Sequence, residues 1–399
     1  MTQHPRQPQR ILFVSTVADL YGGERSLLDV VQHLSPAWQP RFVVPGPGRF
    51  EQALRECGHE VDEIAVPMGI GRGELRELPT VVHLARSIRR CRADLVHLNL
   101  HFAWPIVSAA CLAARVPLVI HVRNMMSGRR GRLERWLFRR AAAVICVSEA
   151  VKQRLLEVQQ LASSGRAAKI RIIPDGRVLA RYQTGDGRRI RRELGISPEA
   201  PLVGMVARLE PMKGQDLFLR AAATVAQRLP EARFLVVGDT MGGLQGDYVR
   251  QLEDLARHPA LAGRVTFLGF RDDVADVLAA LDCFVHPSRR GAFVSVLIES
   301  MAAGVPIVAS DIDGIPECVG RAGPAELVAE LDPDAFAEAI CRVLTDKERA
   351  AAMRAMGRDR ARRLYDVGPL ARRTEEVFAE CLAHGHAFHF SGNRRSVPL

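Results

Sequence analysis

Residues 202–214 read LVGMVARLEPMKG and contain one complete unit of the pattern that decides the fold. The unit begins with a short apolar run, Leu202–Val206, continues as a loop that carries Arg208 and Lys213, and enters a helical pattern near Gly214. Apolar runs without alternation are typical of parallel strands that are covered on both faces. The stretch therefore predicts a buried strand, a loop with two cations and the start of a helix.

Similar apolar runs recur on both sides of this stretch, with amphipathic segments such as Glu24–Leu34 and Thr80–Arg90 between them. The other runs predicted as strands are Ile11–Val14, Arg41–Val44, Val61–Val66, Leu95–Leu98, Leu118–Val122, Ala143–Val147, Ile170–Ile173, Phe234–Val237, Val265–Leu268, Cys283–His286 and Ile307–Ala309. Strands that alternate with helices predict an α/β protein built from doubly wound parallel sheets.

The segment Pro174–Pro201 interrupts this alternation, because it is polar and contains no strand-like run. We place the junction of two Rossmann-like domains there, with the first domain at residues 1–185 and the second at residues 186–365. Residues 366–385 are expected to form a helix that packs back toward the first domain, and residues 386–399 a flexible tail. Ligands of such sheets bind beyond the carboxyl ends of the strands, so the cleft between two facing domains is the expected site.

The composition is that of a folded protein, since 48% of the 399 residues are hydrophobic and 25% are charged. The formal net charge is +10, and the first half of the chain is basic while the second half is mildly acidic. A basic half suggests a phosphorylated ligand, nucleic acid or an anionic membrane, although a general use of arginine explains it equally well. With only 4 Tyr and 3 Trp and no recognition motif, nucleic acid is not an expected partner.

The eight cysteines are scattered and form no C-x-x-C pair, so we expect small core residues of a reducing compartment. The first apolar run, Ile11–Val14, is too short for the apolar core of a signal peptide. The most apolar stretch, Phe102–Val122, is interrupted by Pro105 and Pro117 and does not indicate a membrane span. The sequence therefore predicts a cytoplasmic protein.

Two stretches carry residues suited to binding an anion. Arg208 and Lys213 stand beside a predicted helix N-terminus, where backbone amides also attract negative charge. Residues 287–306 read PSRRGAFVSVLIESMAAGVP and predict a loop followed by a helix, in which Glu299 can accept hydrogen bonds from hydroxyls. Solvated loop cations and a solvent-facing Glu299 remain the alternative. No G-x-G-x-x-G follows the first strand, which disfavours a dinucleotide-dependent dehydrogenase.

Both stretches resemble the retaining nucleotide-sugar glycosyltransferases of family 4, whose GT-B fold places two Rossmann-like domains across a cleft. The likeness spans most of residues 11–385 in order. The matching segments are YGGERSLL (21–28), DLVH (94–97), VICVS (144–148), IIPDG (172–176), VARLEPMKG (206–214), FLGF (267–270), ESMAAGVPIVAS (299–310) and GIPE (314–317). The resemblance implies transfer of a sugar, with retention, from a nucleoside diphosphate to a hydroxyl of a glycan, a lipid-linked molecule or a small molecule.

The resemblance also implies roles for single residues at the diphosphate. Arg208 and Lys213 would bind the diphosphate and stabilise it as it leaves, and so act as catalytic residues. The amides of Ser295 and Val296 would contact it. Gly238 belongs to the same donor-binding set.

Other residues would contact the nucleoside and the sugar. Glu299 would hold the ribose hydroxyls, and backbone groups around Phe270 and Arg271 would meet the base. Gly22 and Gly23 would let the loop of the first domain approach the donor closely.

Three histidines near strand ends are candidates for the sugar or acceptor side. His121 matches a histidine that contacts the donor sugar and is the third predicted catalytic residue, with a core histidine at a strand end as the alternative. His97 and His101 can line the acceptor side or be structural.

One position departs from the family pattern. The pattern has a glutamate eight residues before Glu299, close to the transferred sugar, but this chain has Gly291 there and Val294 at the next glycine. No other carboxylate lies between Asp282 and Glu299. The donor sugar can be unusual, or a first-domain residue such as Glu24 can take over the role. As a third explanation, and the alternative function, the protein binds nucleotide sugars without efficient transfer.

No cofactor and no catalytic metal are expected. Asp311 and Asp313 match the D-x-D pattern of metal-dependent GT-A glycosyltransferases, but they precede the GIPE segment as in the GT-B pattern. Arg208 and Lys213 would then supply the positive charge that a metal provides in GT-A enzymes.

The densest basic stretch is Arg129–Arg140. Its residues Leu133, Trp136, Leu137 and Ala141 share one helical face, which predicts a helix packed on the sheet with a solvated arginine face. Alternatively the stretch contacts an anionic membrane, at its inner face, or a lipid-linked diphosphate acceptor.

Overall fold

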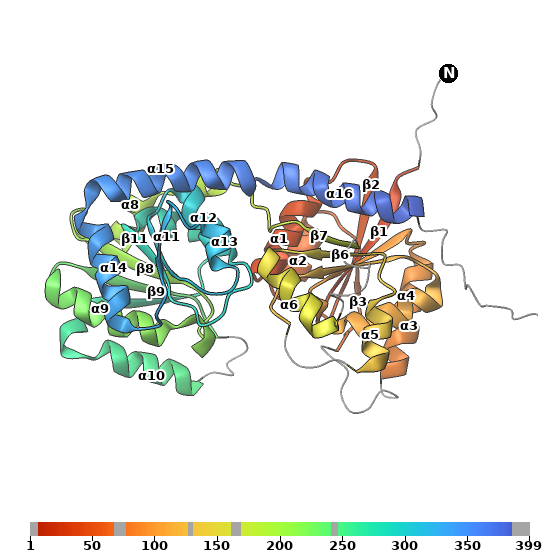
Figure 1. The fold of residues 1–399 in the computed structure, drawn as a ribbon, viewed down its shortest axis with the longest axis horizontal. Helices are drawn as coiled ribbons and strands as arrows, with labels where there is room; N and C mark the ends of the chain where they lie inside the picture. Colours follow the sequence, from red (N-terminus) through yellow and green to blue (C-terminus); the bar gives the residue numbers. More distant parts are fainter. Residues whose placement is uncertain (1–6, 68–76, 127–130, 161–168, 241–245, 385–399) are drawn as a thin grey trace, which may run out of the picture.

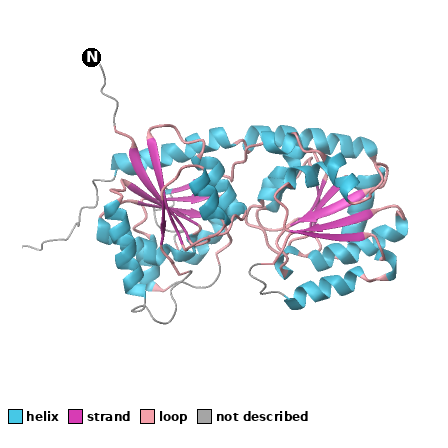
Figure 2. Cartoon of the chain, turned by 180° about the vertical axis from the view of Figure 1, so that it is seen from behind, coloured by secondary structure: helices cyan, strands magenta, loops and turns pink. Residues whose placement is uncertain are grey.

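The computed structural model describes residues 7–67, 77–126, 131–160, 169–240 and 246–384. The chain forms two lobes, each with a central sheet, and helices α15 and α16 run along one side of both (Figure 1). Seen from behind, the strands form two separate groups, each flanked by helices (Figure 2). The predicted tail, residues 386–399, lies outside the described residues.

The first sheet has the strand order β3-β2-β1-β4-β5-β6-β7, and its neighbouring strands are parallel. Its strands are β1 (Gln9–Ser15), β2 (Trp38–Val44), β3 (Val61–Glu63), β4 (Leu95–Asn99), β5 (Leu118–Val122), β6 (Ala143–Cys146) and β7 (Ile170–Ile172). Every apolar run predicted in this half contains a strand, although the third stops at Glu63. The carboxyl ends of the strands meet at the edge that faces the second lobe.

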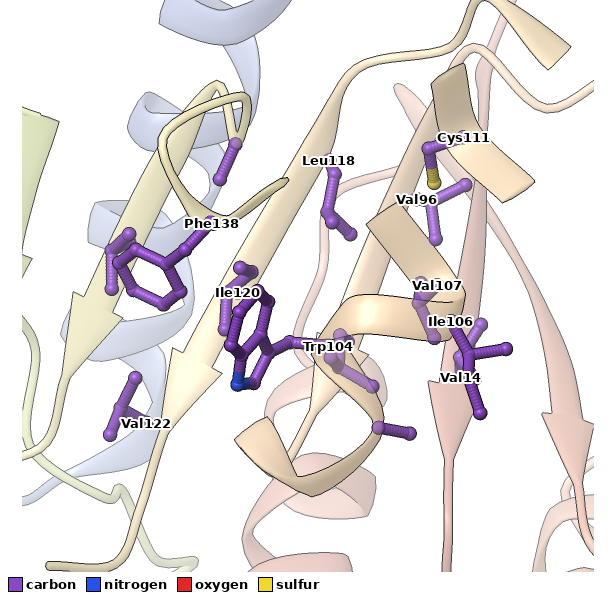
Figure 3. Close-up of a cluster of buried hydrophobic side chains, with 14 of the residues drawn as sticks. Val14, Val96, Trp104, Ile106, Val107, Cys111, Leu118, Ile120, Val122 and Phe138 are labelled. Carbon is purple, nitrogen blue, oxygen red and sulfur yellow. The ribbon is translucent and has the colours of Figure 1, made fainter. Parts of the chain in front are cut away.

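The helices of the first lobe bury apolar side chains on both faces of this sheet. They are α1 (Gly22–Val31), α2 (Arg49–Glu56), α3 (Leu78–Arg90), α4 (Trp104–Ala114), α5 (Arg132–Phe138) and α6 (Glu149–Gln159). Figure 3 shows part of this core, where the indole of Trp104 lies close to Ile120 and Phe138. The Trp104 and Phe138 rings meet edge to face, with centroids 5.4 Å apart. Burial on both faces explains why these strands read as unbroken apolar runs.

The second sheet has the order β10-β9-β8-β11-β12-β13, again with parallel neighbours. Its strands are β8 (Leu202–Val206), β9 (Arg233–Val237), β10 (Val265–Gly269), β11 (Cys283–His286), β12 (Ile307–Ser310) and β13 (Ala325–Val328). Its helices are α9 (Gln215–Arg228), α10 (Gly246–Ala256), α11 (Val274–Ala280), α12 (Ser295–Ala303), α13 (Ile315–Val319), α14 (Pro333–Thr345) and α15 (Lys347–Leu364). The sequence did not indicate β13, because this edge strand contains Glu326 and is only partly buried.

The chain crosses between the lobes within the polar segment Pro174–Pro201. Two short helices, α7 (Ala180–Gln183) and α8 (Gly187–Glu193), lie in this segment, where no strand was expected. Leu179 and Tyr182 pack with side chains of the second lobe. The boundary between residues 185 and 186 stays a prediction.

The last helix, α16 (Val367–His384), returns to the first lobe. Phe378 meets Phe13 edge to face at 6.2 Å and Trp38 at 5.7 Å, and Leu370 and Val377 share the same core. The chain thus crosses the cleft twice, and its two crossings join the lobes.

Two predictions about buried residues need correction. Leu133 and Trp136 are 52% and 46% exposed, whereas Leu137 and Phe138 are buried. Helix α5 is short, and only its carboxyl end reaches the core. Cys57 is exposed, while most of the other cysteines are buried. Among the described residues, no helix is both long and apolar enough to cross a membrane.

Candidate active site

The second lobe presents two cations where β8 ends. The Arg208 guanidinium donates to Glu210 Oε1 at 3.1 Å, and Lys213 Nζ lies 3.9 Å from the same oxygen. The side chains of Arg208 and Lys213 are 38% and 24% exposed. Burial lowers the pKa of Lys213, Glu210 raises it and Arg208 lowers it. One carboxylate shared by two cations leaves a net positive charge, which suits an anionic ligand.

Two helices begin against each other across the cleft, and neither has a side-chain cap. Helix α1 begins at Gly22, and α12 begins at Ser295 followed by Val296. A Cβ at Gly22 would lie 3.4 Å from Ser295 Oγ. Arg208 Cζ lies 5.2 Å from the centroid of the Tyr21 ring, directly before α1. Because each helix N-terminus carries partial positive charge, the two ends and the nearby guanidinium form one region whose charge suits an anion.

Two other predicted glycines lie at the carboxyl edges of the sheets. Gly238 follows β9 with φ +136°, and a Cβ there would lie 1.9 Å from the Ala207 carbonyl oxygen. Only glycine allows the backbone to pass at this point. A Cβ at Gly23, in the first turn of α1, would lie 3.3 Å from Arg123 Cδ, so this turn packs closely against the residue that follows β5.

Glu299, the predicted ribose-binding carboxylate, lies on the second turn of α12 and is 7% exposed. Arg177 Nε donates to Glu299 Oε1 at 2.8 Å. Arg177 was not singled out in the sequence, although it directly follows the matching segment IIPDG. A charged residue inside a turn between two domains was the signal that could have found it.

The residues predicted to meet the base, Phe270 and Arg271, directly follow strand β10. Phe270 is 40% exposed, and Arg49 of the first lobe lies over its ring, 3.9 Å from the centroid. The Arg271 side chain donates to Asp273 at 2.7 Å and to Glu193 at 2.5 Å. The hydrogen bond from Arg271 to Asp273 lowers the pKa of that carboxyl, and the one to Glu193 lowers the pKa of Glu193. Since the Arg271 side chain is committed to these carboxylates, its backbone is the part suited to a ligand.

The first lobe faces this region with a buried polar cluster. Asn99 Nδ2 donates to Glu24 Oε1 at 3.3 Å, and Arg123 Nε donates to Asn99 Oδ1 at 2.8 Å. Arg123 also forms an ion pair with Asp175, and both side chains are about nineteen-twentieths buried. Ser26 donates to Asp175 at 3.0 Å. Only Glu24 among these residues was singled out from the sequence, because Asn99, Arg123 and Asp175 lie in three segments that are far from it along the chain.

Burial controls the charges in this cluster. It raises the pKa of Glu24 from 4.5 to about 7, against the opposing effects of Arg123, Arg208 and a hydrogen bond with Ser15. It lowers the pKa of Arg123 to about 9. Arg208 belongs to the second lobe, so the Glu24 carboxyl lies within the electrostatic reach of the opposite wall.

The three candidate histidines lie beneath this cluster. His121 Nδ1 lies 3.3 Å from Arg123 Nη2 and 3.3 Å from His97 Nε2. Burial lowers the pKa of both, that of His97 to about 3, so both are neutral at neutral pH. His101, on a turn of 3₁₀ helix after β4, is 2% exposed. Their contacts with a donor sugar or an acceptor therefore stay predictions.

The altered position, Gly291, is closely surrounded. A Cβ there would lie 2.9 Å from Ile315 Cδ1 and 3.2 Å from Val294 Cγ2. The Gly291 amide donates to Asp313 Oδ2 at 3.1 Å, and Gly314 donates to the Gly291 carbonyl at 2.9 Å. Ile315 fills the space into which a glutamate side chain at position 291 would start.

The two carboxylates of the D-x-D match have partners in the protein. Asp313 holds the Gly291 amide, and Asp311 pairs with Arg321 at 2.8 Å. Within the described part of the chain, no group of three His, Cys, Asp or Glu residues is arranged to hold a metal ion.

Comparison with known proteins agrees with this geometry. Residues 21–181 match the family described as Glycosyltransferase Family 4, and residues 186–360 match Glycosyl transferases group 1. A D-inositol 3-phosphate glycosyltransferase of Nocardia farcinica is 35% identical over 190 residues, which are 46% of this chain and 42% of that relative. The one of Mycobacterium marinum is 37% identical over 190 residues, 46% and 39% of the two chains. The matched part thus spans less than half the length of these curated relatives.

Solved structures match over nearly the whole chain. HepE of Anabaena, solved in complex with UDP-glucose, has a TM-score of 0.81 and 26% identity, and the match covers 93% of this chain and 99% of HepE. The sucrose-phosphate synthase of Thermosynechococcus elongatus has a TM-score of 0.75 at 22% identity, with 94% and 100% covered, and shows the fold alone. The predicted GT-B fold is confirmed. With a family match on each lobe, the chain belongs to the family 4 glycosyltransferases of GT-B fold.

Proposed function

We propose that this protein transfers a sugar from a nucleoside-diphosphate sugar to a hydroxyl acceptor, with retention and without a metal ion. The observation that carries the proposal is the convergence of Arg208, Lys213 and the uncapped N-termini of α1 and α12. Such a region matches the charge of a diphosphate. The HepE structures, which contain UDP and UDP-glucose, favour a uridine nucleotide as the first donor to test.

In this reaction the bond between the sugar C1 and the diphosphate oxygen breaks, and a bond between C1 and the acceptor oxygen forms on the same face. The acceptor proton passes to the departing diphosphate. Arg208 and Lys213 stabilise the charge that develops there, and each such preorganised donor contributes about 10²–10³ in rate. Closure of the two lobes over the donor excludes water.

We further propose that Glu24 takes over the role of the glutamate that the family pattern has at position 291, where this chain has Gly291. Ile315 occupies the start of the missing side chain, and no carboxylate lies between Asp282 and Glu299. Glu24 stands on the first turn of α1, two residues from Gly22, and within the field of Arg208. With a pKa of about 7, about half of the Glu24 carboxyls carry a proton at pH 7, and the protonated acid would donate a hydrogen bond to a sugar hydroxyl. An unusual donor sugar is the competing explanation, and a panel of nucleotide sugars tests it.

The proposed activity is tested by a thermal-shift screen with UDP, UDP-sugars and other nucleotide sugars, followed by a diphosphate-release assay with an acceptor panel. Stabilisation by a nucleotide sugar together with acceptor-dependent release of the diphosphate supports the proposal. The second candidate, a binding protein without transfer, is motivated by Gly291. Stabilisation without turnover across all acceptors would favour it.

We also propose a cytoplasmic protein that contacts anionic membranes peripherally through the described part of the basic stretch, residues 131–140. Arg129 and Arg130 lie outside the described residues. The exposed Leu133 and Trp136 stand among exposed arginines, and Arg140 lies over the Trp136 ring at 4.6 Å. Apolar side chains surrounded by cations suit an anionic lipid surface.

A sedimentation assay tests this contact with vesicles of phosphatidylglycerol and of phosphatidylcholine. Binding to the anionic vesicles should weaken in Trp136→Ala and not in Phe267→Ala, which removes an aromatic side chain, 37% exposed, from the second lobe. Equal binding to both vesicle types would contradict the proposal.

A further inference from the structure

A single arginine in the crossing segment connects the parts of the site that come from different lobes. Arg177 follows β7, and its side chain is fully buried. Its Nε donates to Glu299 Oε1 at 2.8 Å, and its Nη2 donates to the Gly22 carbonyl oxygen at 3.0 Å. Its Nη1 lies 3.8 Å from Asp29 Oδ2. One guanidinium therefore contacts α12 of the second lobe and both the first turn and the third turn of α1.

These contacts fix the relative position of the two helix N-termini. Gly22 is the first residue of α1, and Glu299 lies one turn after the start of α12 at Ser295. A guanidinium is planar and rigid, and its donors point in fixed directions. Because Arg177 holds an atom near the start of each helix, it sets where the two positive helix ends meet.

The three charged groups of this arrangement are buried, so each needs its partner. Asp29 and Glu299 are both more than nine-tenths buried, and Arg177 is placed between them. A buried carboxylate that loses its cationic partner is strongly unfavourable, so the three groups hold one another in place. Arg181 also pairs with Asp29, at 3.1 Å, but its side chain is 48% exposed, so it is not enclosed between the helices as Arg177 is.

We propose that Arg177 is a positioning residue that aligns the N-termini of α1 and α12, and so builds the binding site for the donor diphosphate. The inference rests on the proposed function and goes beyond it, because it assigns the assembly of the diphosphate site to a residue outside the site. Arg177 does not need to touch the donor. It acts through the Gly22 carbonyl and through Glu299.

The experiment measures the affinity of the full chain for UDP, uridine and inorganic pyrophosphate by calorimetry, in wild type, Arg177→Lys and Arg177→Met. Lysine keeps a cation beside Asp29 and Glu299 and so preserves the fold, but one ammonium cannot reproduce the directions of the three guanidinium contacts. Arg177→Lys should bind UDP and pyrophosphate about tenfold or more weakly, the size expected for lost hydrogen bonds to charged groups.

Arg181→Met is the matched control, since it removes the exposed partner of the same Asp29 and should leave UDP binding unchanged. A melting temperature of Arg177→Lys near that of wild type separates misplacement from unfolding. Arg177→Met is expected to lose both fold stability and UDP binding. Wild-type affinity for UDP and pyrophosphate in Arg177→Lys would overturn the inference alone, whereas a wild type that binds no nucleotide or nucleotide sugar would overturn the proposed function.

Discussion

The two walls of the cleft hold charge in opposite ways. On the first-lobe wall, Glu24, Arg123 and Asp175 are almost completely buried and bound to protein partners. On the second-lobe wall, Arg208 and Lys213 are partly exposed and share Glu210. Buried charges that satisfy one another build a rigid framework, while exposed cations with one shared carboxylate suit an incoming anion. The difference fits our proposal that the second wall binds the diphosphate and the first wall shapes the space beside it.

The largest effect is expected on the free energy of unfolding, when a buried cation is removed from the first wall. Arg123→Met leaves Asp175 buried without its cation and should lower the free energy of unfolding by about 3–5 kcal/mol. Urea denaturation measures this loss. Arg250→Met is the control, because it removes an exposed surface ion pair and should cost about 1 kcal/mol or less. Equal losses in both variants would mean that the first wall is no rigid framework.

The second wall should respond in activity rather than in stability. Arg208→Ala and Lys213→Ala should each lower kcat by about 10²–10³, because each removes a positive charge aimed at the leaving diphosphate. The free energy of unfolding should change little, since both side chains are partly exposed. Steady-state kinetics against Arg257→Ala, a distant exposed arginine of the same lobe, measure the effect. Unchanged turnover in both variants would contradict the assignment of this wall.

Protonation of Glu24 should make the stability of the protein depend on pH. Burial raises its pKa to about 7, so the folded protein keeps a proton that the unfolded chain loses above its ordinary value of 4.5. The stability of the neutral form is complete below pH 4.5 and is lost as pH rises through about 7, by about 3 kcal/mol. Glu24→Gln should remove this component from the difference between unfolding free energies at about pH 5 and about pH 8.

Activity gives a second measurement on the same residue. If protonated Glu24 donates to the sugar, kcat/KM should fall above about pH 7 in wild type and fall less in Glu24→Gln, which keeps a donor. Glu24→Ala should lose activity at every pH. Identical pH profiles in wild type and Glu24→Gln would remove Glu24 from the mechanism.

The smallest effect is expected from the removal of metal ions, which should not change the activity. If Arg208 and Lys213 provide the charge that a metal supplies elsewhere, treatment with EDTA should leave the rate of diphosphate release unchanged. Loss of activity with rescue by Mn²⁺ would show that the second wall needs a metal ion.

Much of the fold was predictable because each strand carries its own signal. The runs Leu118–Val122 and Leu202–Val206 are strands with the predicted limits, since both faces of each sheet are covered. The edge strand β13 was missed because it is half buried and contains Glu326. The inward face predicted for Leu133 and Trp136 was wrong, because periodicity shows that residues share a face but not whether anything covers it.

The features of the candidate site can also be separated into those that the sequence determined and those that the tertiary structure decided. By itself the sequence determined the two-domain α/β plan, the cations Arg208 and Lys213, the loop and helix within residues 287–306 and the absence of a glutamate at Gly291, because each depends on residues close together in the chain. Only the tertiary structure decided that Arg177 joins Glu299 to Gly22, that Arg123 pairs with Asp175, and that Ile315 fills the space beside Gly291. These contacts join residues far apart in sequence, and burial fixes their partners and their charges only once each lobe has folded and, for Arg177 and Glu299, once the lobes have met.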